Sequence, residues 1–279
     1  MKPRAALFLL APATAMFLFT FVAPMFMAGR LSFIGPEGFV GFANYTAAIR
    51  DRYFQRSFLN SFIMVAMAGL PQVMVAYLAA SFFQRFGRRT QAAARFAVYV
   101  PGLAAGVVMG LLYEWILQRE GLLNGLLAMV GIPAIPWLFD IWPSRVALSF
   151  IVMTGGIGGL TIMFSASMSQ IPTELRDAAT IDGASDRQYR AMIVRPLMTP
   201  TILLMVMLAI VGMMQIWETI YILWTEGGPE GGIASPVYEV FLTAFQFGKR
   251  SLSTAKGFIL TLVIGAILIV KSRVERWMK

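Results

Sequence analysis

The sequence contains no cysteine and no histidine among its 279 residues. Disulfide bonds, thiolate nucleophiles and metal or haem sites that need Cys or His are therefore excluded, as is any catalysis that depends on an imidazole. Charge is also scarce: Asp, Glu, Lys and Arg make up 13% of the chain, whereas 58% of it is hydrophobic. This apolar share is well above the roughly 45–50% of soluble domains and indicates a membrane protein.

The net charge of +9 could suggest a nucleic-acid partner. The Lys and Arg residues, however, stand in short clusters beside apolar segments, where they report membrane orientation more simply. We therefore expect membrane lipid, and no nucleic acid, around this chain.

Six long intervals with very little charge predict an all-α polytopic membrane protein, because about 20 apolar residues cross a hydrocarbon core of about 30 Å. The predicted transmembrane helices, within one domain of residues 1–279, are 5–29, 57–84, 96–117, 146–170, 196–224 and 251–270. The first is expected to remain as an uncleaved helix, since its apolar run is longer than that of a signal peptide. Lys256 interrupts the last span and must snorkel outward or face protein.

Prolines inside or at the ends of the spans predict bends rather than helix ends, since membrane helices tolerate them. They are Pro12, Pro24, Pro71 and Pro101. The bias of Lys and Arg predicts the orientation. Most of the 23 basic residues fall inside if both termini are cytoplasmic, which places 85–95 and 171–195 in the cytoplasm.

The cytoplasmic stretch IPTELRDAATIDGASDRQYRAMIVRP, residues 171–196, crowds charges between two apolar spans. Pro172 and Glu174 favour a helix start, and Gly183 favours a break before a second helix that runs towards Pro196. The spacing puts Leu175, Ala178 and Ala179 on one small, smooth face that a partner protein could approach closely, with Asp182 one turn further. The alternative is a pair of amphipathic helices held at lipid headgroups.

The block DAATIDGASDRQYRAMIVRP resembles the cytoplasmic signature of binding-protein-dependent ABC importer permeases: EAA, three residues, G, nine residues, I, one residue, LP. The positions that match its spacing are Asp177, Ala178, Ala179, Gly183, Ile193 and Pro196. Asp177 replaces the usual Glu and keeps the carboxylate, whereas Arg195 replaces the usual Leu. The segments RAALFLLAP, GFANYTAAI, GLLN, PWL, IPTEL and WTEGGP look like the carbohydrate-uptake branch, which takes maltose, multiple sugars or glycerol phosphates.

The resemblance implies a bacterial or archaeal inner-membrane permease that pairs with a second, different permease and receives a carbohydrate from an extracytoplasmic solute-binding protein. It also implies that the coupling loop 171–195 docks in a cleft of a cytoplasmic ATPase dimer. The docking residues would be Asp177, Ala178, Ala179, Asp182 and Gly183. Their charged neighbours would contact the rim of that cleft: Arg176, Asp186, Arg187 and Arg190.

The chain has no phosphate-cradling motif GxxxxGK[ST]. Its one Gly-Lys pair, Gly248-Lys249, has Thr243 and Arg250 where that motif needs Gly and Ser or Thr. We therefore expect a transport subunit that is not an enzyme and has no metal site or cofactor; ATP and Mg would be bound by the partner ATPase. The run at 155–159, GGIGG, lies inside a span, where Gly155 with Gly159 favours close helix packing over local unwinding.

Glu218 lies within a predicted span, where a carboxylate is costly unless it faces a cavity, a partner or an interface. Gln215 and Tyr221 are three residues away on either side, so we expect all three side chains to line the substrate path, with Trp217 pointing elsewhere. Alternatively, they bond to the second permease. Another function also fits these charges: an ion-coupled secondary carrier using Glu218 and Lys256. A membrane scaffold or lipid-processing enzyme is a third reading.

Overall fold

The computed structural model describes residues 3–103, 106–224 and 227–277. Of these described residues, 81% are helical. Within the described ranges its sheet is a single hairpin, in which β1 (Ile34–Gly35) pairs antiparallel with β2 (Gly38–Phe39) and Ile34 lies opposite Phe39. The prediction of an all-α polytopic membrane protein is confirmed.

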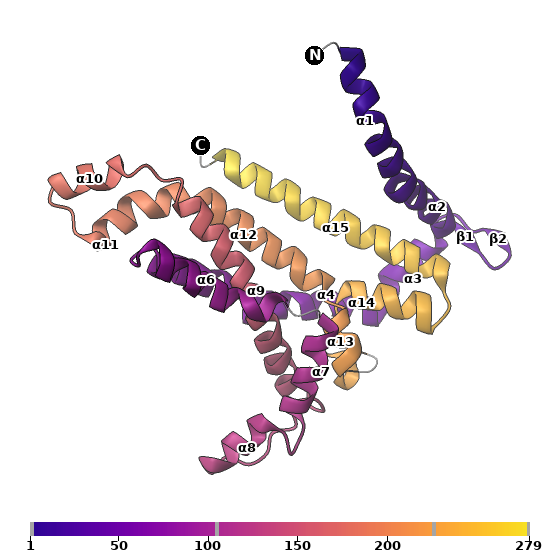
Figure 1. The fold of residues 1–279 in the computed structure, drawn as a ribbon. Coiled ribbons are helices and arrows are strands. Elements are labelled where there is room, and N and C mark those ends of the chain that lie inside the picture. Colours follow the sequence, from indigo (N-terminus) through magenta and orange to yellow (C-terminus); the bar gives the residue numbers. More distant parts are fainter. Residues whose placement is uncertain (1–2, 104–105, 225–226, 278–279) are drawn as a thin grey trace. The chain divides into compact units, whose positions relative to one another are not determined.

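The chain divides into two compact units, Met1–Gln55 with Glu239–Val263, and Arg56–Tyr238 with Ile264–Lys279. The first unit holds β1, β2, α1 (Pro3–Phe17), η1 (Leu18–Val22), α2 (Ala23–Ser32), α3 (Ala43–Arg50) and η6 (Leu242–Gln246). The second holds η2 (Val65–Gly69), α5 (Leu70–Phe83), α6 (Arg88–Leu103), α7 (Gly106–Leu117), α8 (Leu122–Met129), α9 (Ile141–Met168), α10 (Glu174–Ile181), α11 (Asp186–Tyr189), η3 (Arg190–Val194), α12 (Arg195–Gln215), α13 (Glu218–Leu223) and η5 (Pro229–Gly231). Residues of both units occur in α4 (Arg52–Met64), α14 (Pro236–Phe241) and α15 (Arg250–Trp277) (Figure 1).

Helical stretches long and apolar enough to cross a membrane overlap the predicted spans. In the described part of the chain they are Leu10–Ser32, Arg52–Phe83, Ile141–Met168, Asp186–Leu223 and Arg250–Arg273. A sixth, predicted as one helix over 96–117, is instead a pair of segments, Arg88–Leu103 and Val108–Met129, bent by 87°. Residues 104–105 of that prediction lie outside the described residues.

The prolines lie within helical runs and do not end them, as predicted; the predicted bends stay a prediction. Pro12 and Pro101 lie inside α1 and α6. Pro24, Pro71 and Pro196 each stand two residues after a π-helical turn: η1, η2 and η3. Proline clashes with the carbonyl four residues earlier, and in all three cases that carbonyl lies in the wider π turn. The helical run therefore continues through the proline.

The glycine run of α9 packs closely against two helices of the second unit. A Cβ at Gly158 would lie 2.5 Å from the Val98 carbonyl oxygen on α6, and a Cβ at Gly156 would lie 2.6 Å from Gln72 Oε1 on α5. A Cβ at Gly159 would meet nothing within 4 Å. A Cβ at Gly155 would also meet nothing, so the close packing is made by Gly156 and Gly158 and not by the predicted pair. Since α9 is continuous from Ile141 to Met168, local unwinding is not found.

Arg145 lies just before the predicted span 146–170, but the helix already begins at Ile141. Arg145 lies inside α9, is 8% exposed, and donates from Nε to the Gly232 carbonyl at 3.1 Å and from Nη2 to Asn60 Oδ1 at 3.0 Å. Asn60 in turn donates to the carbonyls of Gly231 and Ala234 at 3.0 and 3.2 Å. The glycine-rich segment before α14 is thus bound into the second unit; Thr225 and Glu226 of its WTEGGP motif lie outside the described residues.

Lys256 is a buried anchor of the first unit. Its side chain is 2% exposed, and its Nζ lies 2.8 Å from Asp51 Oδ2 and 3.4 Å from Glu239 Oε2. Nζ also donates to Thr243 Oγ1 at 2.8 Å and lies 5.4 Å from the centre of the Phe54 ring. Burial raises the pKa of the Asp51 carboxyl, but the hydrogen bond and charge of Lys256 outweigh it, so this pKa lies below its usual value. Lys256 therefore faces protein and does not snorkel.

Replacing Gly158 by Ala should lower the melting temperature of the detergent-solubilised protein by several degrees, because the added methyl overlaps the α6 backbone and overpacking costs about 1–3 kcal/mol. Gly159→Ala is the matched control and should melt like the wild type, since its methyl enters open space. Equal melting temperatures for the two variants would contradict the packing described for α9.

Candidate functional site

The loop 171–195 folds into two short helices joined by a left-handed glycine. Gly183 has φ +76°, a conformation that glycine adopts readily and most residues do not. The Gly183 N–H donates to the Thr180 carbonyl at 3.1 Å, and the Ala184 N–H donates to the Ala179 carbonyl at 2.9 Å. These two bonds form a Schellman motif that ends α10. The predicted helix, glycine break and second helix are confirmed.

The second helix begins with a capping box. The Gln188 N–H donates to Ser185 Oγ at 3.4 Å, and the Ser185 N–H donates to Gln188 Oε1 at 2.8 Å. Both ends of the connection are therefore fixed by local hydrogen bonds. The loop between α10 and α11 consequently has a defined shape.

The predicted smooth face of α10 is divided in the structure. Ala178 is exposed, Leu175 is 38% exposed and Ala179 only 6%, because neighbouring residues of a helix point about 100° apart. Ala179 lies beside a small cavity that Ala184 and Tyr189 also line. Asp177, Asp182 and Gly183 are exposed, as is Ile181 at 86%. The outward surface of α10 therefore combines small, acidic and apolar residues, and Ala179 faces the chain itself.

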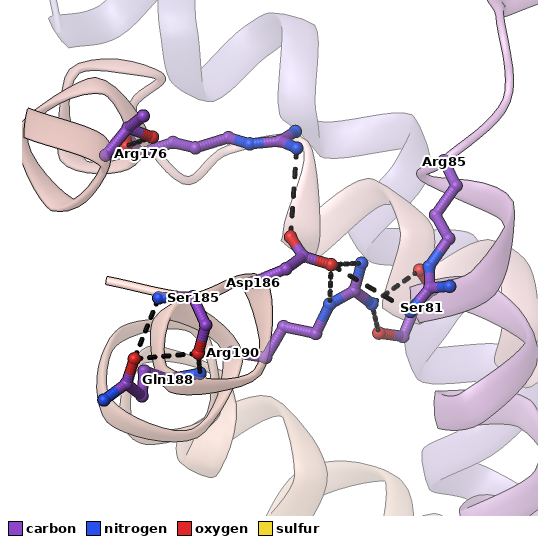
Figure 2. A network of polar contacts seen from close by, with 8 residues as sticks. Ser81, Arg85, Arg176, Ser185, Asp186, Gln188 and Arg190 are labelled. Atoms are coloured by element: carbon purple, nitrogen blue, oxygen red, sulfur yellow. Dashed lines mark hydrogen bonds and ion pairs between the residues drawn. The ribbon is translucent and has the colours of Figure 1, made fainter. Parts of the chain in front are cut away.

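Asp186 is the centre of an ion-pair network that holds the two helices together (Figure 2). Arg190 donates to Asp186 Oδ2 from Nε at 3.2 Å and from Nη2 at 3.1 Å. Nη2 of Arg176, on α10, lies 3.9 Å from Asp186 Oδ1, and Nη2 of Arg85 lies 4.0 Å from Oδ2. One carboxylate therefore lies among three guanidinium groups from three segments of the chain.

Arg190 also connects this network to a membrane span. Its Nη1 donates to Ser81 Oγ at 2.7 Å and to the Ser81 carbonyl at 3.1 Å, in the last turn of α5 (Figure 2). A cavity of about 650 Å³ lies beside this bridge, and Met168 at the end of α9 also lines it. The sequence suggested Arg176, Asp186 and Arg190 as rim contacts for a partner, which stays a prediction; in the structure both arginines pair with Asp186. Arg187 of that group is exposed.

The three predicted path residues do not share one helix. α12 ends at Gln215 and α13 begins at Glu218. The spacing of three between these two residues therefore does not put their side chains on one helix face. The break forms where the Ile216 carbonyl accepts a hydrogen bond from Ser235 Oγ. Glu218 and Tyr221 do share α13, and both are exposed, as is Gln215. Trp217, expected to point elsewhere, instead lies with its ring centroid 6.5 Å from that of Tyr221.

Comparison with known proteins places this fold. No protein-family model matches the chain. The ABC transporter permease protein YurN of Bacillus subtilis is 27% identical over 265 residues, which cover 91% of this chain and 89% of YurN. The arabinooligosaccharides transport system permease protein AraP of the same organism is 23% identical over 280 residues, covering 98% and 89%. The ABC transporter permease protein ORF1 of a Caldicellulosiruptor species is 36% identical over 107 residues, which cover 37% of this chain and 76% of ORF1. The chain belongs to the ABC transporter permeases.

A solved structure shares this fold. A chain of a bacterial ABC transporter involved in the import of the acidic polysaccharide alginate is 20% identical, with a TM-score of 0.87 and coverage of 96% of this chain and 93% of that chain. Permease subunits are transport components and are not themselves ATPases. This permease is accordingly a multi-pass membrane protein with a transport role.

Replacing Arg190 by Ala should loosen α11 and η3 from α5. Hydrogen bonds to charged groups are worth about 1.5–3 kcal/mol, so hydrogen exchange of the amides in 186–194 should become at least about tenfold faster. Arg89→Ala, which removes an exposed arginine from α6, is the control and should leave exchange unchanged. Unchanged exchange in the Arg190 variant would show that the bridge to Ser81 does not fix these helices.

Proposed function

We propose that this permease is a subunit of an ATP-driven importer for an oligosaccharide or related carbohydrate. The observation that carries the proposal is the match to AraP, a permease named for arabinooligosaccharides, over 98% of this chain. The fold shared with a permease of an alginate importer supports it. The translocation path would form between this permease and a second one.

Coupling to the ATPase would use the outward surface of α10. Asp177, Ala178, Asp182 and Gly183 are exposed on a segment whose turn is fixed by backbone hydrogen bonds. Ala179 would act indirectly, because a small side chain there lets α10 lie close to the rest of the loop. The Arg190 bridge to Ser81 gives a mechanical route from this surface to α5. ATP and Mg would be bound by the separate ATPase dimer.

Orientation and external partners follow from the same proposal. The excess of Lys and Arg in the coupling loop and at 85–95 favours a cytoplasmic position for them, with both termini cytoplasmic. An extracytoplasmic solute-binding protein would deliver the substrate to the opposite side. A related alginate transporter has been solved with a periplasmic protein that carries an alginate pentasaccharide.

The substrate path would include Gln215, Glu218 and Tyr221 at the break between α12 and α13. Interrupted helices in transporters expose backbone groups as well as side chains to a ligand. The Trp217 and Tyr221 rings lie together beside Glu218, a combination of aromatic face and carboxylate that suits sugar hydroxyl groups. The competing role for these residues is a bond to the second permease.

The ion-coupled carrier is the weaker alternative. It needs Lys256 as part of a relay with Glu218. In the structure the Lys256 ammonium is buried and already paired with Asp51 and Glu239. Such a fully compensated charge is suited to holding helices together.

Replacing Gly183 by Val should uncouple ATP hydrolysis from uptake, because a β-branched residue at φ +76° is strained by at least about 1–2 kcal/mol. We expect the substrate transported per ATP hydrolysed to fall at least about fivefold in proteoliposomes. Asn tolerates left-handed backbone, so Gly183→Asn should retain most coupling. Full coupling in the Val variant would count against the docking role.

Replacing Glu218 by Gln should reduce substrate-stimulated transport about tenfold while the complex stays assembled, since a hydrogen bond to a charged group is lost. Glu120→Gln, at an exposed position before α8, is the control and should transport normally. Unchanged transport by an intact Glu218→Gln complex would remove Glu218 from the path. Loss of the second permease during purification would instead favour the role at the subunit interface.

A further inference from the structure

A second concave surface lies outside the coupling helix, between the end of α5 and the start of α12. This groove has a volume of about 410 Å³. Its lining combines an apolar floor with arginines and contains no acidic residue. The residues that matter for its chemistry are Leu78, Phe82, Arg85, Arg187, Arg190 and Arg195.

The four arginines differ in how many hydrogen bonds and ion pairs their guanidinium groups already make. Arg190 is committed to Asp186 and Ser81, and Arg85 is 4.0 Å from Asp186. In the described part of the chain, the guanidinium groups of Arg187 and Arg195 have no hydrogen bond or ion pair, and both residues are exposed. The nearby Asp186 offsets one of the four positive charges. The groove therefore attracts an anion and has two guanidinium groups available to bind it.

The apolar floor continues along α5. Met74, Leu78 and Phe82 stand four residues apart on one face of that helix and are 59%, 57% and 51% exposed. A stripe of this length runs about 12 Å at about 1.5 Å per residue. It extends from the arginine cluster into the span that crosses the membrane, Arg52–Phe83. An acyl chain laid along this face would cover it.

We propose that this groove is a binding site for an anionic phospholipid, with its phosphate between Arg187 and Arg195 and one acyl chain along Phe82, Leu78 and Met74. The position is the depth of lipid headgroups, because α5 ends at Phe83 and α12 begins at Arg195. Bidentate guanidinium groups suit a phosphate, and anionic lipid is enriched in the leaflet that basic segments face. A bound lipid would brace the helix η3 that carries Arg190. The proposal is independent of which substrate is transported.

Lipid retention by the complete transporter, with its partner permease and ATPase, tests the proposal by native mass spectrometry. The probes are phosphatidylglycerol, phosphatidylcholine with the same acyl chains, and inorganic phosphate. We expect wild-type protein to prefer phosphatidylglycerol, and the double variant Arg187→Gln/Arg195→Gln to bind it about tenfold more weakly. Arg88→Gln/Arg89→Gln removes the same charge from exposed positions on α6 and should change binding less than twofold.

Further variants distinguish a lipid from other occupants of the groove. Phe82→Ala should weaken phosphatidylglycerol binding severalfold, because the acyl chain loses its contact with the Phe82 ring. The single variant Arg187→Gln should weaken phosphatidylglycerol binding less than the double variant does. Equal lipid binding by the two double variants would overturn the proposal. So would displacement of the lipid by millimolar inorganic phosphate, which would indicate a free-phosphate site. Since the chain has no other cysteine, Phe82→Cys can also report a protein occupant: a crosslink to the second permease would overturn the lipid assignment.

Discussion

The arrangement of the loop 171–195 depends on the hydrogen bonds of the Arg190 guanidinium. This guanidinium donates simultaneously to Asp186 on the surface helix and to Ser81 at the end of a membrane span. With its side chain 28% exposed, Arg190 is better shielded from solvent than the other members of the network, so its bonds are screened less. Arg190 therefore joins α11 to the end of α5 through short, charged contacts. The Schellman turn at Gly183 fixes the connection between α10 and α11.

Elsewhere, buried charges fix segments that apolar packing alone would leave loose. Lys256 is surrounded by two carboxylates and a hydroxyl in the first unit. In the second unit, Arg145 and Asn60 bind carbonyl groups of the glycine-rich segment before α14. In both cases a polar side chain on a span-forming helix satisfies groups from a less regular segment. The buried charges of Lys256 and Arg145 thus hold the segments that connect the spans. Gly156 and Gly158, in contrast, let α9 lie close to α5 and α6.

The sequence predicted the structure best where a feature depends only on residues in the same segment. Gly183 ends a helix because its own backbone permits φ +76°, and the apolar intervals locate the spans because length and composition suffice. Prediction from the sequence failed where the structure of a segment involves contacts with residues far along the chain. The helix breaks after Gln215, where Ser235 binds the Ile216 carbonyl, and Arg145 is buried where Asn60 and Gly232 receive its hydrogen bonds. Likewise, the burial of Ala179 but not Ala178 depends on how the second helix folds back.

The central claim is that the exposed surface of α10 contacts an ATPase in the cytoplasm. Because the chain lacks cysteine, Ile181→Cys provides a single thiol on that surface, at a position that is 86% exposed. The most direct measurement is thiol crosslinking in membranes that contain the complete transporter, with and without ATP. The account predicts a crosslink to the ATPase subunit, in an amount that changes with ATP. Labelling of this thiol by a membrane-impermeant reagent from outside the cell, with no crosslink to the ATPase, would contradict it.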